Sequence, residues 1–344
     1  MELCHNDYRL PAESEPQQAL MLTWPHPNTD WKDCLDEITA VYIAMADAIT
    51  KQEDLWIVTP QKQVVGQLLA QRLTVEQCQR VRYFDMETND TWARDHAALT
   101  LKCGGEFKYL DFKFNGWGEK FAWQKDNAIT KKMAEQQAFS GVVEDHNDFV
   151  LEGGSIESDG EGTILTTSFC LLAPHRNQPL TQEEIELRLK KMLHADRILW
   201  LNHGRLLGDD TDGHIDTIVR MAPNDALLYV FCEDKTDEQY EDFKAMEEEL
   251  KQLRTRKGAP YRLIPLPFPD AIIADGERLP ATYANFVILN GAILCPTYVQ
   301  PANDAKAMAQ LQKAFPDREI IGIDARTVIR QHGSLHCLTM QFPK

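Results

Sequence analysis

The amino-acid sequence predicts an α/β fold in which five ββαβ units close into a ring, a five-bladed α/β propeller. Four hairpin-like segments, with turns at Gly104, Gly160, Asn224 and Gly291, recur roughly every 60 residues, a period typical of repeated supersecondary units. Each hairpin is followed by a helical pattern and then by another apolar strand pattern. The two ends of the chain supply the parts of a fifth unit, which would close the ring and leave few exposed sheet edges.

The chain begins with two helix and strand pairs that have no hairpin before them. Apolar residues recur at helical spacing over residues 33–50, and a strand pattern follows at 55–59. A second helix and strand are expected at 63–72 and 81–86. We expect these elements to combine with a last strand, at 335–342, into the fifth unit.

The four complete units follow in order. Hairpins are expected over residues 100–109, 156–167, 215–231 and 286–295, the last around an Asn-Gly turn, which is a strong hairpin signal. Helices are expected at 126–137, 181–193, 236–253 and 303–315, and closing strands at 149–151, 198–201, 261–266 and 319–323. Capping boxes, Thr181 with Glu184 and Thr236 with Gln239, predict where two of the helices begin.

Composition narrows the class of protein. The chain has 344 residues, of which 43% are hydrophobic, and no linker divides it, so we expect one catalytic domain over residues 1–344. The net charge of −17 argues against a nucleic-acid partner and is compatible with a cationic small molecule.

Location and assembly are inferred from what the sequence lacks. No apolar run is long enough to span a membrane, and no signal-peptide pattern is visible, which together favour a cytoplasmic protein without membrane contact. The eight cysteines form no C-x-x-C pair and are expected to be reduced thiols. The oligomeric state stays open, with a homo-oligomer as one alternative.

The segment from Gly208 to Asp216, G-D-D-T-D-G-H-I-D, holds four aspartates and one histidine between two apolar runs. Carboxylates near a core are costly unless a cation or a proton-carrying group compensates. If His214 begins a strand, His214 and Asp216 point to the same face, because strand side chains alternate. A hydrophilic turn with solvated aspartates is the competing interpretation.

If the units are related by rotation, the residues that begin them converge on the axis of the ring. These residues include Trp92 and Asp95, Glu152, His214 and Asp216, and Cys337. One hypothesis is a metal site built from His214, Asp216, Glu152 and Cys337, although no spacing matches a compact zinc motif. The other is a thiol nucleophile, Cys337, assisted by His214, with carboxylates binding a planar guanidinium and Trp92 stacking on it. The second hypothesis explains the acids, the histidine and the thiol together.

Several motifs resemble the agmatine deiminase family of the guanidine-modifying, or pentein, superfamily, some of whose relatives act on peptidyl-arginine. They are Trp92-Ala-Arg-Asp95, Glu152-Gly-Gly-Ser-Ile156, Asp159-Gly-Glu-Gly-Thr163, Gly208 to Asp216, and His336-Cys337. The resemblance runs from about Pro25 to the last residues, with the motifs in the family order. It implies the five-bladed propeller around a central active site, and no metal or organic cofactor.

The resemblance also implies roles for individual residues. Cys337 would attack the guanidinium carbon, while His214 would protonate the departing ammonia and then activate water. Asp95 and Asp216 would bind the guanidinium nitrogens. The remaining residues expected to contact the substrate are Trp92, Trp117, Glu152 and Asp210.

The reaction implied is hydrolysis of agmatine to N-carbamoylputrescine and ammonia, a step toward putrescine, through an S-alkylthiouronium intermediate. Peptidyl-arginine deimination, amidino transfer and silent guanidine binding are the alternatives.

Two segments depart from the family pattern. The chain has Arg94-Asp95-His96-Ala97-Ala98 where the family usually has R-D-x-G-P, and Q-H-G-S-L-H-C at 331–337 where it usually has G-G-G-N-I-H-C. Both keep the carboxylate and the nucleophile, so the chemistry is expected to persist while the substrate is the open question.

Overall fold

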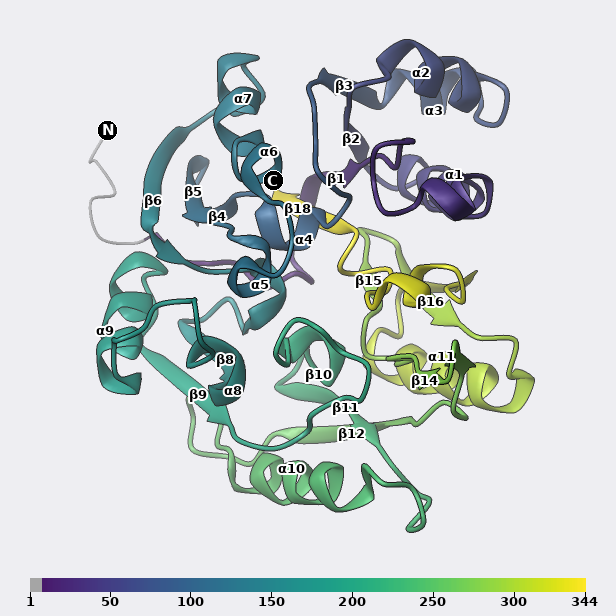
Figure 1. Cartoon of the computed structure of the whole chain (residues 1–344). Helices are drawn as coiled ribbons and strands as arrows, with labels where there is room; N and C mark the ends of the chain where they lie inside the picture. The colour runs from purple at the N-terminus through teal and green to yellow at the C-terminus, as the bar shows by residue number, and fades with distance from the viewer. Residues whose placement is uncertain (1–7) are drawn as a thin grey trace.

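A computed structural model describes residues 8–344 and shows five blades, each built on a sheet of three or four strands, arranged around a central axis with the longer helices on the outside (Figure 1). In four of the five sheets, the first two strands form an antiparallel hairpin and the third strand lies parallel to the second. The chain therefore forms the repeated ββαβ units expected from its sequence.

The first blade contains β4 (Leu99–Cys103), β5 (Glu106–Lys113) and β6 (Val142–Val150), with α5 (Gly116–Glu119), α6 (Gln124–Asn127) and α7 (Ile129–Glu135). The second contains β7 (Ile156–Ser158), β8 (Thr163–Thr167) and β9 (Arg197–Leu201), with α8 (Ser168–Leu171) and α9 (Gln182–Met192).

The third blade contains β10 (Val219–Ala222), β11 (Ala226–Phe231), α10 (Tyr240–Gln252) and β12 (Arg262–Pro267). The fourth contains β15 (Val287–Ile288), β16 (Ala292–Thr297), α11 (Pro301–Ala314) and β17 (Glu319–Asp324). A short hairpin of β13 (Ile273–Ala274) and β14 (Glu277–Arg278) lies between the third and fourth blades.

The fifth blade joins the two ends of the described chain. The strand β18 (Thr339–Pro343) pairs antiparallel with β1 (Gln17–Thr23), with Leu20 opposite Gln341. The blade continues through β2 (Asp54–Thr59) and β3 (Val81–Asp85), both parallel to β1, with α1 (Leu35–Thr50), α2 (Lys62–Ala70) and α3 (Val75–Gln79) as connections. The ring closes as the sequence predicts, although β1 was not foreseen. Its residues form a short, almost fully buried apolar run, which lacks the alternation that marks a half-buried strand.

One of the two predicted capping boxes differs from the structure. The capping box at Thr181 and Glu184 is present, but the one at Thr236 and Gln239 is wrong because α10 begins only at Tyr240. The Gln239 side chain instead accepts a hydrogen bond from the Leu207 backbone at 2.6 Å, so it holds a loop rather than a helix end.

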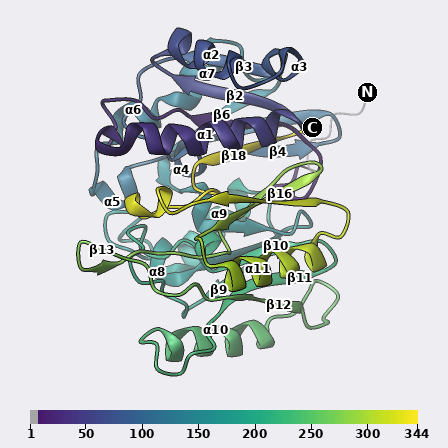
Figure 2. The same ribbon diagram turned by 90° about the vertical axis from the view of Figure 1, so that its right-hand side faces the viewer.

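A series of single helical turns precedes the first strands of the blades. These are α4 (Ala93–His96), η2 (Gly153–Ser155) and η3 (Ile215–Thr217), besides η1 (Lys32–Cys34) and η4 (Val328–Gln331). The condition considered from the sequence, that His214 begins a strand, is not met: His214 caps η3, and β10 begins only at Val219. Figure 2 shows that α5 and β13 lie toward one face of the ring and the C-terminus toward the other. Within residues 8–344, no helix is long and apolar enough to cross a membrane.

Candidate active site

The turns that lead into the first strands bring five side chains to the axis of the ring. Asp95 lies in α4, Glu152 directly precedes η2, and His214 caps η3. Asn285 and Cys337 lie shortly before β15 and β18. All five are buried. Because the blades are related by rotation, positions far apart in the sequence meet at this point.

Backbone hydrogen bonds tie these turns to one another. The Arg94 N–H donates to the carbonyl oxygen of Cys337 at 3.1 Å, and the His336 N–H donates to the Asn285 carbonyl at 3.2 Å. The Gly154 N–H donates to Asp95 Oδ1 at 3.0 Å. The orientation of the site is therefore set by backbone contacts between blades, which restrict side-chain freedom.

Asp95 is held from three sides. Besides Gly154, the Trp117 Nε1–H donates to its Oδ2 at 3.0 Å, and His214 Nδ1 lies 3.6 Å from its Oδ1. Burial raises the pKa of Asp95 to about 6, although the neighbouring His214 acts in the opposite direction. A cation bound beside this carboxylate would therefore offset the cost of burying its negative charge.

Asp216 is the second carboxylate beside the thiol. Its Oδ2 accepts a hydrogen bond from His336 Nδ1 at 2.7 Å and lies 3.9 Å from Cys337 Sγ. Its Oδ1 is buried and has no hydrogen-bond partner among residues 8–344. Burial acts to raise the pKa of Asp216, but the hydrogen bond and charge of His336 outweigh it and leave the pKa below its usual range. Asp216 is accordingly an ionised group with one free acceptor.

Asn285 positions the nucleophile candidate. The Asn285 Oδ1 atom accepts the backbone N–H of Cys337 at 3.2 Å and lies 3.4 Å from Sγ. Burial, followed by the charges of Asp216 and Asp95, raises the pKa of the Cys337 thiol well above its usual value. A cation placed between the two carboxylates would remove that repulsion and favour the thiolate.

His214 is fully buried and faces Asp95, Glu152 and Cys170. Burial acts to lower its pKa, yet the charge of Asp95 and the contact with Cys170 raise the pKa well above the usual histidine value. Neither ring nitrogen has a hydrogen-bond partner within the described chain. An imidazole whose protonated form is favoured in this way can act as a general acid.

Glu152 is connected to the loop that carries His214. Its Oε1 accepts a hydrogen bond from Arg176 Nε at 2.8 Å, and Arg176 also donates to the Thr211 carbonyl at 2.7 Å and to Asp212 at 2.6 Å. Its Oε2 is buried without a partner in the described part of the chain. Arg176 thereby fixes Glu152 and the loop as one unit.

A cavity of about 190 Å³ opens above the thiol. Its walls include Trp92, Trp117, Asp95, Asp210 and Cys337, whereas His214, Asp216 and Glu152 lie behind it. The rings of Trp92 and Trp117 meet edge to face, with centroids 6.4 Å apart. The cavity is also lined by Asp30, Asp90 and Phe121, to which the sequence analysis gave no role. Thr211, from the segment Gly208 to Asp216, and Gln331, His332 and Gly333, from the segment that departs from the family pattern, complete the lining.

The wall of this cavity is acidic. Burial, and then the charge of Asp30, raises the pKa of Asp90 to about 7, while burial and Asp209 raise that of Asp210 to about 6. Asp90 also accepts a hydrogen bond from Trp92 Nε1 at 3.2 Å. None of the described residues that line the cavity is an arginine or a lysine. The cavity suits a ligand with positive charge along its length.

Gly154 and Gly333 permit the close approach of groups at the site. A Cβ at Gly154 would lie 2.6 Å from His214 Nδ1 and 2.9 Å from Asp95 Oδ1. A Cβ at Gly333 would lie 2.1 Å from the ring of Trp92. An added side chain at either position would clash with a neighbouring group, so only glycine fits there.

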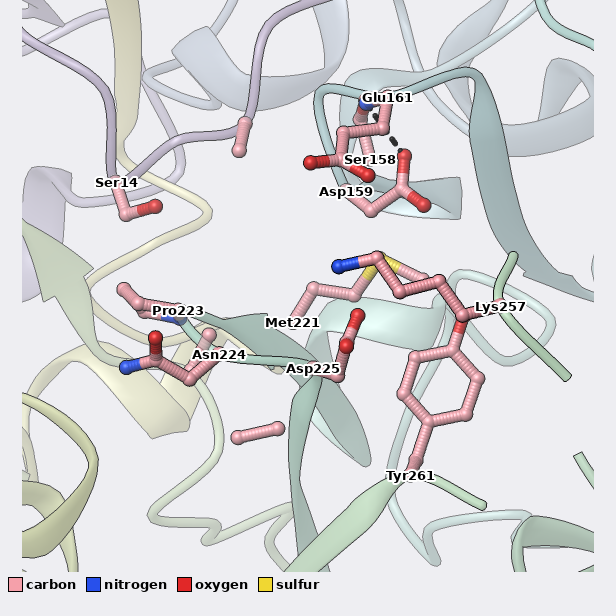
Figure 3. Close-up of a pocket in the computed structure, with 13 residues that line it drawn as sticks. Ser14, Ser158, Asp159, Glu161, Met221, Pro223, Asn224, Asp225, Lys257 and Tyr261 are labelled. Carbon is pink, nitrogen blue, oxygen red and sulfur yellow. Dashed lines mark hydrogen bonds between the residues drawn. The ribbon is translucent and has the colours of Figure 1, made fainter. Parts of the chain in front are cut away.

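A larger cavity, of about 400 Å³, lies at the hairpin turns of the second and third blades (Figure 3). Lys257 reaches into it alongside Asp159 and Asp225, and Ser14 borders it. It contains none of the site residues predicted from the sequence. Hairpin turns lie at the ends of the blades remote from the converging residues, so this cavity is separate from the thiol.

The sequence pattern of the Porphyromonas-type peptidyl-arginine deiminase family matches residues 9–343. The chain belongs to this family. Agmatine deiminase from Pseudomonas aeruginosa (strain UCBPP-PA14) is 32% identical to the chain, over 98% of this chain and 95% of that protein.

Solved structures are also similar over nearly the whole chain. A Cys-to-Ser variant of C. jejuni agmatine deiminase with substrate bound is 37% identical, with a TM-score of 0.90, and the match covers 98% of this chain and 96% of that one. A Porphyromonas gingivalis structure, provisionally named an arginine deiminase, is 47% identical, with a TM-score of 0.93 and coverage of 98% and 99%. The pentein propeller expected from the sequence is thereby confirmed.

The four residues of the metal site considered from the sequence do not come together as one group. His214 and Glu152 lie together with Cys170, with ligand atoms within 4.8 Å of one another, rather than with Cys337. Asp216 is instead engaged by His336. The carboxylates beside the thiol are arranged as separate acceptors, which matches the fork of a guanidinium.

Sequence reasoning did not assign roles to several residues of this deiminase site. Asn285 was given no role, although it lies just before the first strand of the fourth unit, and its equivalence to Asp95 and His214 was the signal that could have identified it. His336 appeared only as part of a motif. Arg176 and Glu13 carry no motif, and only the folded structure brings them to the centre.

Proposed function

We propose that the protein is a hydrolase that removes one nitrogen, as ammonia, from the guanidine group of agmatine, giving N-carbamoylputrescine. The observation that carries this proposal is the position of Cys337 Sγ beside the carboxylates Asp95 and Asp216, at the floor of an acidic cavity. Family membership and the similarity to agmatine deiminases support the same reaction.

In the first step, the guanidinium N–H groups donate to Asp95 and to the free Oδ1 of Asp216. The bound positive charge favours the Cys337 thiolate, which attacks the guanidinium carbon. His214 transfers its proton to the departing nitrogen, the C–N bond breaks and ammonia leaves. A thiouronium group, with a C–S bond to Cys337, remains.

In the second step, the neutral His214 accepts a proton from a water molecule as the water oxygen attacks the same carbon. The C–S bond then breaks, the thiolate is restored, and a ureido product leaves. Glu152, held by Arg176, faces His214 and stabilises its protonated state. Overall, one water is consumed and one ammonia is released.

The acidic wall of the cavity favours agmatine over free arginine. The amine at the far end of agmatine is a cation, which Asp90 and Asp210 attract, whereas free arginine carries a carboxylate that the same acids repel. An arginine residue within a peptide lacks that free carboxylate, and the family description names peptidyl-arginine. Peptidyl-arginine is therefore the second candidate substrate.

The proposal is tested by measuring ammonia and ureido product from agmatine, free arginine and an arginine peptide. Cys337→Ala should abolish turnover, whereas Cys78→Ala, on the outer helix α3, should retain it. Inactivation by iodoacetamide but not by a chelator would support thiol chemistry. Turnover of the peptide alone would overturn the choice of agmatine, and no ammonia from any substrate would overturn the hydrolase.

We further propose that the protein acts on its small substrate without a nucleic-acid partner, a view supported by its net charge of −17. A single catalytic domain and a cytoplasmic location are proposed as well, and a homo-oligomer stays one alternative for the oligomeric state. Limited proteolysis, cell fractionation and light scattering test these three points.

A further inference from the structure

The segment of residues 8–16 runs along the side of the ring where the hairpin turns lie, since Arg9 donates to the Gly160 carbonyl and Ala12 and Ser14 line the larger cavity. The Arg9 N–H donates to Lys102 in the first blade, and the Leu10 carbonyl accepts from Ser158 in the second. Arg318, just before β17 of the fourth blade, donates to the Ser14 carbonyl at 2.6 Å. We call residues 8–16 the strap, since it connects three blades outside the repeat.

Glu13 projects from the strap into the centre of the ring. Its carboxylate accepts hydrogen bonds from Arg94 Nη1 at 2.9 Å and from Arg220 Nη2 at 2.7 Å, and lies 2.8 Å and 3.0 Å from His336 Nε2. The side chains of Arg94 and Arg220 are 2% and 0% exposed, and that of Glu13 is 16% exposed. Burial acts to raise the pKa of Glu13, but the three neighbours outweigh it and leave the pKa well below the usual range.

His336 connects this carboxylate to the catalytic cavity. Its Nε2 faces Glu13, and its Nδ1 lies 2.7 Å from Asp216 Oδ2. An ionised carboxylate only accepts hydrogen bonds, so both ring nitrogens face acceptors. Arg220 Nη2 also lies 3.0 Å from Nε2, but the same group donates to Glu13 at the shorter distance of 2.7 Å. The geometry favours an imidazole ring that carries a proton on each nitrogen.

The charges around His336 lead to the same conclusion. Two cations, Arg94 and Arg220, lie among three carboxylates, Glu13, Glu157 and Asp216. His336 lies between two of these carboxylates and can donate to both only with a hydrogen on each ring nitrogen, and a buried carboxylate left without a donor is costly. Without the Glu13 carboxylate, Nε2 of His336 would lose this acceptor.

We propose that Glu13 is a positioning residue for the reaction, which acts through His336 on Asp216 and Cys337. It keeps His336 donating to Oδ2 of Asp216, so that Oδ1 stays turned toward the guanidinium. It also keeps a positive charge near Cys337 Sγ, which otherwise faces the two carboxylates Asp216 and Asp95. This inference rests on the proposed function only in taking Cys337 as the nucleophile.

The test compares Glu13→Gln with Glu15→Gln in the full chain. Glu15 lies on the same strap and pairs with Arg9, but it does not contact the central cluster, so it controls for loosening of the strap. The rate of Cys337 alkylation by iodoacetamide is measured against pH without substrate, with mass spectrometry to distinguish Cys337 from the other cysteines. We expect Glu13→Gln to move this profile to higher pH by about one unit, the size expected when a nearby charge is lost, and Glu15→Gln not to move it.

A second readout uses turnover. We expect Glu13→Gln to lower kcat about tenfold or more, with a much smaller change in KM, because the nucleophile and not the cavity wall is affected. If Glu13→Gln does not fold, Glu13→Asp serves in its place. It keeps the negative charge but places it farther from His336, and it should move the alkylation profile by less in the same direction. An alkylation profile identical to wild type in the folded variant would overturn the inference. Alkylation needs no substrate, so a failure of the protein to turn over agmatine would be distinguishable from a failure of this proposal.

Discussion

The side-chain oxygen of Asn285 lies 2.9 Å from the backbone nitrogen of His336 and 3.2 Å from that of Cys337. One side chain of the fourth blade thus holds two consecutive N–H groups of the fifth. The carbonyl oxygen of Asn285 accepts the His336 N–H as well. The turn that carries the nucleophile is therefore held by its neighbouring blade as well as by its own backbone hydrogen bonds, such as that from the Thr339 N–H to the His336 carbonyl at 3.0 Å.

We expect Asn285→Ala to lower both stability and activity. The buried Cys337 N–H loses its acceptor, which costs about 1–3 kcal/mol, whereas the His336 N–H keeps the backbone carbonyl of Asn285. Thermal unfolding and kcat measure the two effects. Asn303→Ala, which removes a partly exposed amide of α11, is the matched control and should leave both near wild type. Unchanged kcat in Asn285→Ala would contradict the role given to this residue.

Gly154→Ala should reduce kcat/KM by about a hundredfold or more, since a displacement of catalytic groups by about 1 Å costs on that order. The added methyl group would lie 2.6 Å from His214 Nδ1 and 2.9 Å from Asp95 Oδ1, so one of them must move. Gly105→Ala, at the turn between β4 and β5, has nothing within 4 Å of its Cβ and is the control. Equal activity of the two variants would argue against the catalytic importance of this contact.

The pH dependence of kcat/KM should show an acid limb near pH 6. Burial raises the pKa of Asp95 to about 6, so below this pH the carboxyl is neutral and cannot pair with a guanidinium. As pH rises through 6, the ionised form accumulates and kcat/KM increases, by about tenfold per unit on the steep part of the limb. Initial rates over about pH 5 to 8 at low agmatine concentration measure it. A profile that stays flat through pH 6 would show that Asp95 does not control binding.

Asp210→Asn should raise KM for agmatine more than KM for butylguanidine, which has the same guanidine group but no terminal amine. The difference should be about threefold to tenfold, corresponding to about 1 kcal/mol for one charge contact in a partly open cavity. Asp148→Asn removes a charge from an exposed site on β6 and controls for the net charge. Equal effects on both substrates would place the amine elsewhere.

The repeat and the residues at its unit starts could be predicted because they depend on local patterns. Strand alternation, helical periodicity and turn residues are properties of a few neighbouring positions. Asp95, Glu152, His214 and Cys337 then meet because rotation brings equivalent positions together. The convergence of these residues therefore follows from the repeat and needs no further information.

The support of the site could not be predicted in the same way. Glu13 lies on the strap, outside the repeat. It contacts His336, which is far from it in the sequence. Arg176 reaches Glu152 from the loop before α9. His214 was placed at a strand start because periodicity does not distinguish the last turn before a strand from the strand itself. Such contacts are set by tertiary packing, which has no local signature.

The closure of the ring by β1 and β18 has a consequence for how the protein folds. Leu20 and Gln341 must find each other across nearly the whole chain, and contacts of such long range are slow to form because a large loop must first be closed. Cys337 lies two residues before β18, so its surroundings are assembled in this late step. We expect the nucleophile to become ordered only when the ring closes, which makes recovery of activity during refolding a direct measure of ring closure.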